Sequence, residues 1–120
     1  MVLKSYAKIN LSLTVNKKKP NGLHEIQSLY CLVDLFDEKK ITKIINKKIN
    51  KISFYGKFFK DIRPQNNSIS KILNILRKYK FISGHYNIRI KKKIPVFAGL
   101  GGGTSNAATI KTIIVAKIKV

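Results

Sequence analysis

Four glycines fall within one five-residue window of the chain, at Gly99 and from Gly101 to Gly103. The window follows an alternating, strand-like run and precedes a stretch that is compatible with a helix. A backbone without side chains can adopt positive φ angles and turn its N–H groups toward an anion. The helix that follows adds unpaired N–H groups and the positive end of its dipole. Phosphate is therefore the ligand that this glycine loop predicts.

Two hydroxyl residues, Thr104 and Ser105, directly follow the last glycine. Their side chains can cap the helix, donate to phosphate oxygens or ligate a phosphate-bound magnesium ion, and these roles are compatible. A glycine cluster can also be a purely structural turn, because glycine permits tight packing. Generic nucleotide motifs fit poorly, since the P-loop needs a lysine at position 104 and the dinucleotide pattern needs a glycine at 104 or 106. The loop belongs to another phosphate-binding class.

A second pair of polar residues, Lys8 and Asn10, lies near the start of the chain. Apolar residues alternate with polar ones from Ala7 to Val15, which predicts a half-buried strand. On such a strand Lys8 and Asn10 point to the same face, roughly 6.6 Å apart, so they can jointly contact a polar substrate. For an average protein, a solvated lysine on the polar face would be a sufficient explanation of Lys8.

The rest of the chain divides into short runs that must position these residues. Asn21-Gly22 is a strong turn signal, and Asn67 can cap a helix whose apolar residues recur every three or four positions. Strands mixed with helices in this order indicate a mixed α/β domain. The predicted elements are strands at residues 7–15, 23–33, 41–45, 51–59 and 85–90, a helix from 67–68 to about 83–84, and a second helix after the glycine loop.

Length and composition indicate one domain, because the chain has 120 residues of which 44% are apolar. No apolar run approaches the roughly 18 to 20 residues of a membrane helix, and the first fifteen residues lack the features of a signal peptide. A cytoplasmic location, without membrane contact, is the expectation. The single cysteine, Cys31, has apolar neighbours and no partner for a disulfide or zinc site, so we expect a packed thiol.

The chain is strongly basic, with 25 lysines and arginines against five acidic residues and a formal charge of +20. Such a charge raises the prospect of a nucleic-acid partner. The basic residues are nearly all lysine, however, and they are spread along the whole chain together with isoleucine and asparagine. Since these three residues have A/T-rich codons, a biased genome is a sufficient explanation. Clustered arginines with interleaved aromatics, typical of nucleic-acid surfaces, are not evident.

The run from Pro95 to Ala108 resembles the ATP-binding motif of the GHMP kinase superfamily. Its triple glycine followed by Thr-Ser-Asn-Ala-Ala is similar to the loop of one branch, the 4-diphosphocytidyl-2-C-methyl-D-erythritol kinases, which have a serine in place of Thr104. Two further segments agree in order and spacing. Residues 7–11 resemble the opening strand of that branch, and residues 21–29 resemble its Asp-Gly-Tyr-His-Glu-Leu-Gln-Thr segment. The resemblance covers the N-terminal portion of such a kinase.

This resemblance implies an α+β fold, that of the GHMP kinase N-terminal domain (ribosomal protein S5 domain 2-like). The fold has a mixed sheet with helices on one side, and we expect the domain to be incomplete in this chain. It implies ATP and Mg²⁺ as cofactors, with Ser105 as a possible magnesium ligand. Asn67 resembles an asparagine of the nucleotide pocket, although capping alone would explain it. The residues implied to bind ATP are Pro95, Gly99, Leu100, Gly101, Gly102, Gly103, Thr104, Ser105, Asn106 and Asn67.

The implied reaction transfers the γ-phosphoryl group of ATP to the 2-hydroxyl of 4-diphosphocytidyl-2-C-methylerythritol, in non-mevalonate isoprenoid synthesis. By resemblance, the catalytic residue Lys8 lies near the reacting hydroxyl and Asn10 contacts the substrate. His24 stands where the family hydrogen-bonds the cytosine, because a neutral imidazole can both donate and accept. Leu23 stands where the family commonly has a tyrosine able to stack on the base.

The family's general base is an aspartate in a Gly-Ala-Asp-Val-Pro-like segment downstream of the glycine loop, and no aspartate of this chain matches it. We therefore expect residues 1–120 to be a partial N-terminal ATP-binding domain without the C-terminal domain. Three alternatives stay open at this point. The chain could be an incomplete fragment that binds at most nucleotide, a basic RNA-binding relative, or a kinase of the same fold that acts on homoserine or mevalonate.

Overall fold

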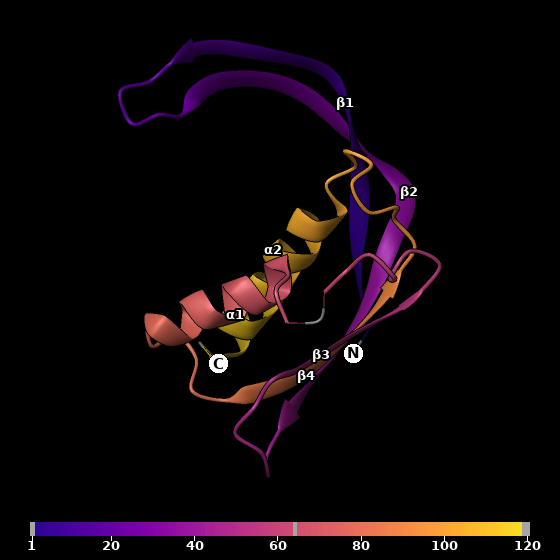
Figure 1. Ribbon diagram of the computed structural model, residues 1–120, viewed down its shortest axis with the longest axis vertical. Helices are drawn as coiled ribbons and strands as arrows, with labels where there is room; N and C mark the ends of the chain where they lie inside the picture. The colour runs from indigo at the N-terminus through magenta and orange to yellow at the C-terminus, as the bar shows by residue number, and fades with distance from the viewer. Residues whose placement is uncertain (1, 64, 119–120) are drawn as a thin grey trace.

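The structure of the chain, a computed structural model, describes residues 2–63 and 65–118. Within these residues four strands form one mixed sheet in the order β1-β2-β4-β3 (Figure 1). The β1–β2 and β2–β4 pairs are antiparallel, and the β3–β4 pair is parallel. The expected α+β architecture is confirmed. The elements are β1 (Val2–Lys18), β2 (His24–Ile44), β3 (Lys51–Gly56), α1 (Ser68–Lys78), β4 (His85–Lys92) and α2 (Gly102–Ile118).

Both helices lie on the same face of the sheet, as expected, and the apolar core lies between them and the strands (Figure 1). α1 contributes an apolar stripe whose members recur at three- and four-residue spacing, which is the period of one helix face. β4 contributes two isoleucines that alternate with polar residues, as the inner face of a strand requires. The buried members of this core are Ile69, Leu73, Leu76, Ile82, Ile88, Ile90, Ile110 and Ile114.

The two ends of α1 explain where the helix begins and stops. At its start, Asn67 Oδ1 accepts hydrogen bonds from the N–H groups of Ile69 and Ser70, each at 3.0 Å, so the predicted cap is confirmed. At its end, Lys80 adopts a φ of 59° and donates to the Arg77 carbonyl, while Phe81 donates to the Leu76 carbonyl. This Schellman pattern ends the helix at Lys78. The predicted end near residues 83–84 was wrong by several residues.

The strand at the centre of the sheet differs from its prediction. The two strands expected at residues 23–33 and 41–45 fall, except for residues 23 and 45, within the single 21-residue strand β2. Residues 24–40 of β2 pair with β1, and residues 38–44 pair with β4 on the other side. The turn between β1 and β2 is confirmed at Asn21 and Gly22, where Gly22 has a φ of 84° and Leu23 N donates to Asn21 Oδ1 at 3.0 Å.

The outer parts of β1 and β2 form an extension that we call the arm, residues 9–32. These strand segments pair only with each other, because the pairing of β2 with β4 begins at Glu38. Register shifts interrupt the β1–β2 ladder, and such bulges bend strands, as seen where the arm curls over the helix side of the sheet (Figure 1). The arm is therefore a two-stranded ribbon that leaves the sheet.

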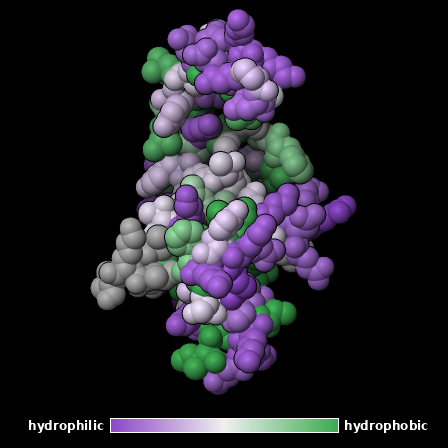
Figure 2. Space-filling model, turned by 90° about the vertical axis from the view of Figure 1, so that its left-hand side faces the viewer, coloured by the Kyte–Doolittle hydropathy of each residue, from purple (hydrophilic) through white to green (hydrophobic). Residues whose placement is uncertain are grey.

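Apolar side chains on the arm are exposed, which corrects two expectations. The strand at residues 7–15 was expected to be half-buried, yet Leu11 is 63% exposed and only Ala7 is buried; Cys31, expected to be packed, is exposed. The physical reason is that no layer of the described residues covers this ribbon. Figure 2 shows hydrophilic side chains over the top of the molecule, at the tip of the arm, with hydrophobic ones beside them. In the described part of the chain, no helix has the length and apolar character needed to cross a lipid bilayer.

The core generates a stability prediction with a control on the same helix. Leu73 of α1 is fully buried, so Leu73→Ala should lower the free energy of unfolding by about 2–5 kcal/mol through lost burial and a residual cavity. Ile75 on the opposite face is half exposed, so Ile75→Ala should cost less than about 1 kcal/mol. Urea denaturation followed by circular dichroism measures both. Equal losses in the two variants would contradict this placement of the core.

Candidate functional site

A cavity of about 670 Å³ lies between the glycine loop and the segment that leads into α1. One wall is the loop and the first turn of α2, and the facing wall is the chain around Asn66 and Ser68. Phe54 of β3 and Lys92 of β4 complete the lining. A concave site of this size is in the range of small-molecule pockets. The lining residues are Phe54, Asp61, Ile62, Arg63, Asn66, Asn67, Ser68, Ile69, Lys71, Lys92, residues 95–104 and Asn106.

The glycine loop turns the backbone into the start of α2. Gly99 and Gly101 adopt φ angles of 71° and 69°, which favour glycine. The first α-helical hydrogen bond of α2 runs from Ser105 N to the Gly101 carbonyl at 2.9 Å. The N–H groups of the helical residues before Ser105 lie in the first turn, where an α-helix has no internal partner for them. These groups and the helix dipole make the glycine end of the cavity suited to an anion.

Lys8 lies against this loop, although it is 91 to 95 positions away from the glycines in the sequence. Its backbone N–H donates to the Leu100 carbonyl at 3.0 Å. A Cβ atom added at Gly101 would lie 3.1 Å from Lys8 Cε and 3.2 Å from Lys8 Cγ, so the lysine stem packs directly on that glycine. The Lys8 ammonium is 5.6 Å from the centroid of the Tyr30 ring on β2. The structure therefore brings the predicted catalytic lysine beside the predicted phosphate loop.

The other residues predicted to contact substrate lie farther out along the arm. Asn10 is exposed, and its Oδ1 accepts a hydrogen bond from Ser28 Oγ at 3.2 Å across the ribbon. His24 is exposed and pairs with Lys18 at the tip of the arm, outside the lining of the cavity. The structure thus joins Lys8 to the loop but does not bring His24 to it. The substrate roles of Asn10 and His24 stay predictions.

Three residues beside the loop have different surroundings. Thr104 is exposed and lines the cavity, whereas Ser105 does not line it. The Ser105 carbonyl accepts from the hydroxyl of Thr109 at 2.9 Å and from that of Ser5 at 3.4 Å, which ties α2 to β1. Asn67 lines the cavity, and its side chain also caps α1, with Nδ2 donating to the Arg63 carbonyl at 2.8 Å. Its role toward a nucleotide stays a prediction.

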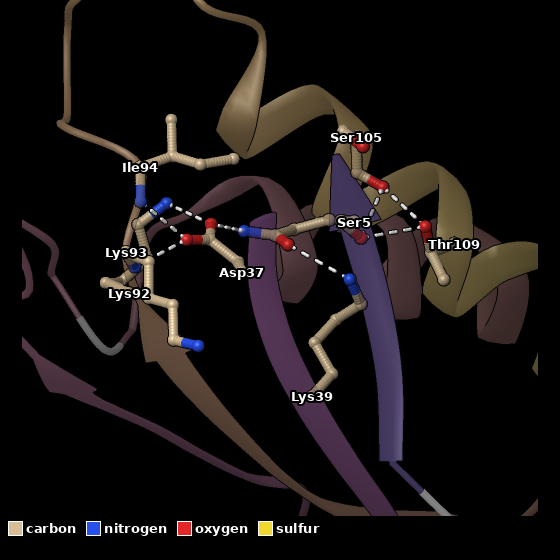
Figure 3. A network of polar contacts seen from close by, with 9 residues as sticks. Ser5, Asp37, Lys39, Lys92, Lys93, Ile94, Ser105 and Thr109 are labelled. Carbon is tan, nitrogen blue, oxygen red and sulfur yellow. Dashed lines mark hydrogen bonds and ion pairs between the residues drawn. The ribbon is translucent and has the colours of Figure 1, made fainter. Parts of the chain in front are cut away.

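A buried polar network holds the start of α2 against the sheet, and we call it the Asp37 network (Figure 3). Asp37 is fully buried on β2 and points toward the end of β4. Its Oδ1 accepts from the backbone N–H groups of Lys93 and Ile94 at 2.8 and 2.9 Å. Its Oδ2 accepts from Asn106 Nδ2 at 2.7 Å and forms an ion pair with the ammonium of Lys92. All four acceptor positions of the carboxylate are therefore used.

A second buried lysine, Lys39 of β2, extends the network through Asn106. Its side chain is 1% exposed, and its ammonium donates to Asn106 Oδ1 at 3.1 Å. Burial lowers the pKa of Lys39 to about 8, with Asp37 opposing the shift and the Lys92 charge adding to it. Asn106 thus contacts an acceptor on one side and a donor on the other, which fixes the orientation of its amide. Sequence patterns missed Asp37 and Lys39, because a charged residue in a strand is ordinarily exposed.

The site's acidic residues bear on metal binding. Across residues 2–63 and 65–118, no group of three or more histidine, cysteine, aspartate or glutamate side chains could hold a metal ion. The carboxylate of Asp61 and the hydroxyl of Thr104 both line the cavity. Magnesium is commonly held by phosphate oxygens and water with only one or two protein ligands. The donor set therefore fits a magnesium ion that arrives with a phosphate ligand.

The Asp37 network generates a prediction with its neighbour as the matched control. Asp37→Asn leaves the buried ammonium of Lys92 without its counter-charge, so the free energy of unfolding should fall by about 3–5 kcal/mol. Glu38 forms a half-exposed ion pair with Lys93, whose hydrogen bond lowers the Glu38 pKa, so Glu38→Gln should change stability much less. Adding Lys92→Met to Asp37→Asn should restore part of the loss. Urea titrations of the four proteins test this, and similar losses in Asp37→Asn and Glu38→Gln would contradict it.

Lys39 generates a prediction about pH. Its pKa is about 8 when folded and about 10.4 when unfolded, so between these values the unfolded chain binds more protons. Stability contributed by this group therefore rises with pH, by about 2 kcal/mol from pH 7.5 to 9.5. The Lys39→Met variant lacks the titrating group, so its stability should not show this rise. Parallel urea titrations across the pH range measure the difference, and superimposable pH profiles would show that Lys39 is not buried.

Comparison with known proteins agrees with this arrangement. Residues 67–117 match the family described as the GHMP kinases N terminal domain. The chain is 45% identical to 4-diphosphocytidyl-2-C-methyl-D-erythritol kinase of Pelagibacter ubique over 116 residues, which cover 96% of this chain and 40% of that protein. It is 42% identical to the same-named kinase of Ureaplasma parvum over 112 residues, covering 92% of this chain and 42% of that protein. The chain thus spans about 40% of the length of these relatives.

A solved structure gives the same answer at the level of the fold. The crystal structure of a 4-(cytidine 5′-diphospho)-2C-methyl-D-erythritol kinase superposes with a TM-score of 0.71 at 26% identity, covering 98% of this chain and 41% of that one. The superposition includes the arm as well as the sheet and helices, because it covers nearly the whole chain. Residues 67–117 therefore belong to the family of GHMP kinase N-terminal domains, and the fold of the chain is that of this domain.

Proposed function

We propose that this chain carries the nucleotide-binding part of a kinase that phosphorylates the 2-hydroxyl of 4-diphosphocytidyl-2-C-methyl-D-erythritol with ATP. The observation that carries the proposal is the packing of Lys8 on Gly101. In this proposal the contact puts the cation of Lys8 beside the glycine loop that would bind the phosphates. A kinase needs this arrangement, because the phosphoryl group must pass from the nucleotide to an acceptor at their common boundary.

Each part of the site has a definite task in this scheme. The N–H groups at the start of α2 and the loop Gly99–Gly103 bind the phosphates of ATP, and Thr104 donates its hydroxyl. The Lys8 ammonium stabilises the charge on the transferring group or lowers the pKa of the acceptor hydroxyl. The hydroxyl oxygen bonds to the γ-phosphorus as the bond to the ADP oxygen breaks, and the hydroxyl proton passes to a base. Magnesium would neutralise phosphate charge; Thr104 and Asp61, which line the cavity, would hold it, whereas the expected ligand Ser105 does not line the cavity.

The acceptor site follows from the arm. Asn10 and His24 would contact the diphosphocytidyl end of the substrate, with His24 hydrogen-bonded to the cytosine. The exposed apolar side chains of the arm, including Leu23, would pack against the substrate or against a closing domain. We further propose that residues 1–120 represent part of the ATP-binding domain, and that the base and the closing domain belong to the portion of the relatives that this chain does not match.

A methyl group placed in the cavity tests the phosphate site. Gly103 lines the cavity, and a Cβ added there meets only Ser68 Oγ at 3.6 Å, an ordinary contact. Gly103→Ala should therefore keep or raise the melting temperature, because alanine favours the helix, while it should weaken ATP binding at least about 10-fold by obstructing the phosphates. Isothermal titration calorimetry with ATP and magnesium measures the affinity.

The matched control is Ala108→Val, an exposed enlargement on α2 that does not line the cavity and should leave ATP affinity unchanged. Saturable binding that requires magnesium and responds to Gly103→Ala but not to Ala108→Val supports the proposal. Binding that falls steeply with salt, extends to any polyanion and ignores both substitutions would reject it in favour of a basic nucleic-acid-binding chain.

A further inference from the structure

Phe97 has an unusual backbone conformation at the rim of the cavity. It lines the cavity, yet it is 92% exposed, the highest exposure among the large apolar side chains of the described residues. Its φ is 60°, in the left-handed region that a bulky side chain rarely adopts. Both features are unfavourable in the unliganded chain, because the aromatic ring is left in water and the backbone is strained.

The second non-glycine residue with positive φ shows what an ordinary explanation looks like. Lys80 has a φ of 59°, but it lies just past the end of α1 and its N–H donates to the Arg77 carbonyl in the Schellman pattern. Phe97 ends no helix, and in the described part of the chain its backbone forms no hydrogen bond of a turn or a cap. The end of a helix therefore explains the positive φ of Lys80, but it does not explain the positive φ of Phe97. Strain of this kind persists at ligand clamps, where the ligand gives it a use.

The lining of the cavity combines two kinds of chemistry. The glycine loop offers N–H groups to phosphate, as described above. The rest of the lining includes the apolar side chains of Phe54, Ile62, Val96 and Phe97 together with polar and charged ones such as Asn66 and Arg63. No arm residue lines the cavity, so a nucleotide whose phosphates lie on the glycine loop has to place its nucleoside against the rest of this lining, which includes Phe97. An aromatic ring within reach of the nucleoside can meet the flat face of a base.

We propose that Phe97 stacks on the base of the bound nucleotide and that its left-handed backbone conformation presents the ring for this contact. The inference rests on the proposed function, since it needs phosphates at the glycine end. Stacking removes the exposed ring from water and covers one face of the base, which is a sequence-tolerant contact of any aromatic side chain with a base. The strain in the free chain is then the cost of holding the ring in advance of the ligand.

Phe97→Gly separates stability from binding. Glycine adopts positive φ freely, so the melting temperature should rise by about 2–6 °C. Loss of the stacked ring should weaken ATP binding about 5- to 100-fold. Inorganic tripolyphosphate has no base, so its affinity should not change. Calorimetric titration of both ligands and thermal unfolding of both proteins measure these quantities.

Phe97→Trp provides a direct optical readout, because the chain contains no other tryptophan. The new indole keeps the stacking surface, so ATP should bind about as tightly as in the natural chain and should quench the tryptophan fluorescence. Tripolyphosphate should bind without quenching. These two results together assign the contact to the base rather than to the phosphates.

Three outcomes overturn the proposal. Equal losses of ATP and tripolyphosphate affinity in Phe97→Gly would show that the residue only shapes the loop, and unchanged affinities with no fluorescence quenching would show that the ring has no contact with the base. If the natural chain binds neither ligand, the proposed function itself fails and the stacking role fails with it. Tripolyphosphate binding by the natural chain separates this last result from the first two.

Discussion

The carboxylate of Asp37 joins three elements that no other charged group joins in the described part of the chain. It accepts hydrogen bonds from the two backbone N–H groups that directly follow β4. It also forms an ion pair with Lys92 and accepts a hydrogen bond from the amide of Asn106 near the start of α2. A buried charge is tolerated only when it is fully paired and hydrogen-bonded, so these partners cannot move independently. The glycine loop runs between the end of β4 and the start of α2. Because Asp37 holds both of these ends, it sets the position of the loop.

The exposed and the buried lysines of this molecule have different effects. Most of the excess lysines are exposed and affect only solubility and long-range attraction of anions. Lys39 and Lys92 are both buried near the single carboxylate of Asp37, with which only Lys92 forms an ion pair, so their neighbourhood has an excess of positive charge close to a cavity that is suited to phosphate. Burial is the main cause of the low pKa of Lys39, and the charge of Lys92 adds to the shift. Net charge is thus a poor guide to the site, whereas two specific ammonium groups are informative.

Local signals were the part of the sequence that predicted structure correctly. The glycine window, the Asn21-Gly22 turn and the Asn67 cap depend on a few neighbouring residues, and each is found where it was expected. The exposure of the arm could not be predicted, because alternation shows that a strand has two faces but not whether anything covers them. Asp37 and the contact of Lys8 with Gly101 depend on the tertiary fold, and one-dimensional spacing contains no information about either.

The links between β1 and α2 have a consequence for the order of assembly. Ser5 bonds to Ser105 and Thr109, residues 100 and 104 positions away, whereas the β1–β2 hairpin closes over a short turn. Contacts across long sequence separations form late, because much chain entropy must be lost before they can be made. The hairpin should therefore form early and the contacts that fix the glycine loop and α2 should form last. Detachment of α2 would dismantle the cavity while the β1–β2 hairpin survives. It would also break the bonds of Asn106 in the Asp37 network and expose the buried side chains of Ile110 and Ile114, so this opening should cost a large part of the stability of the domain.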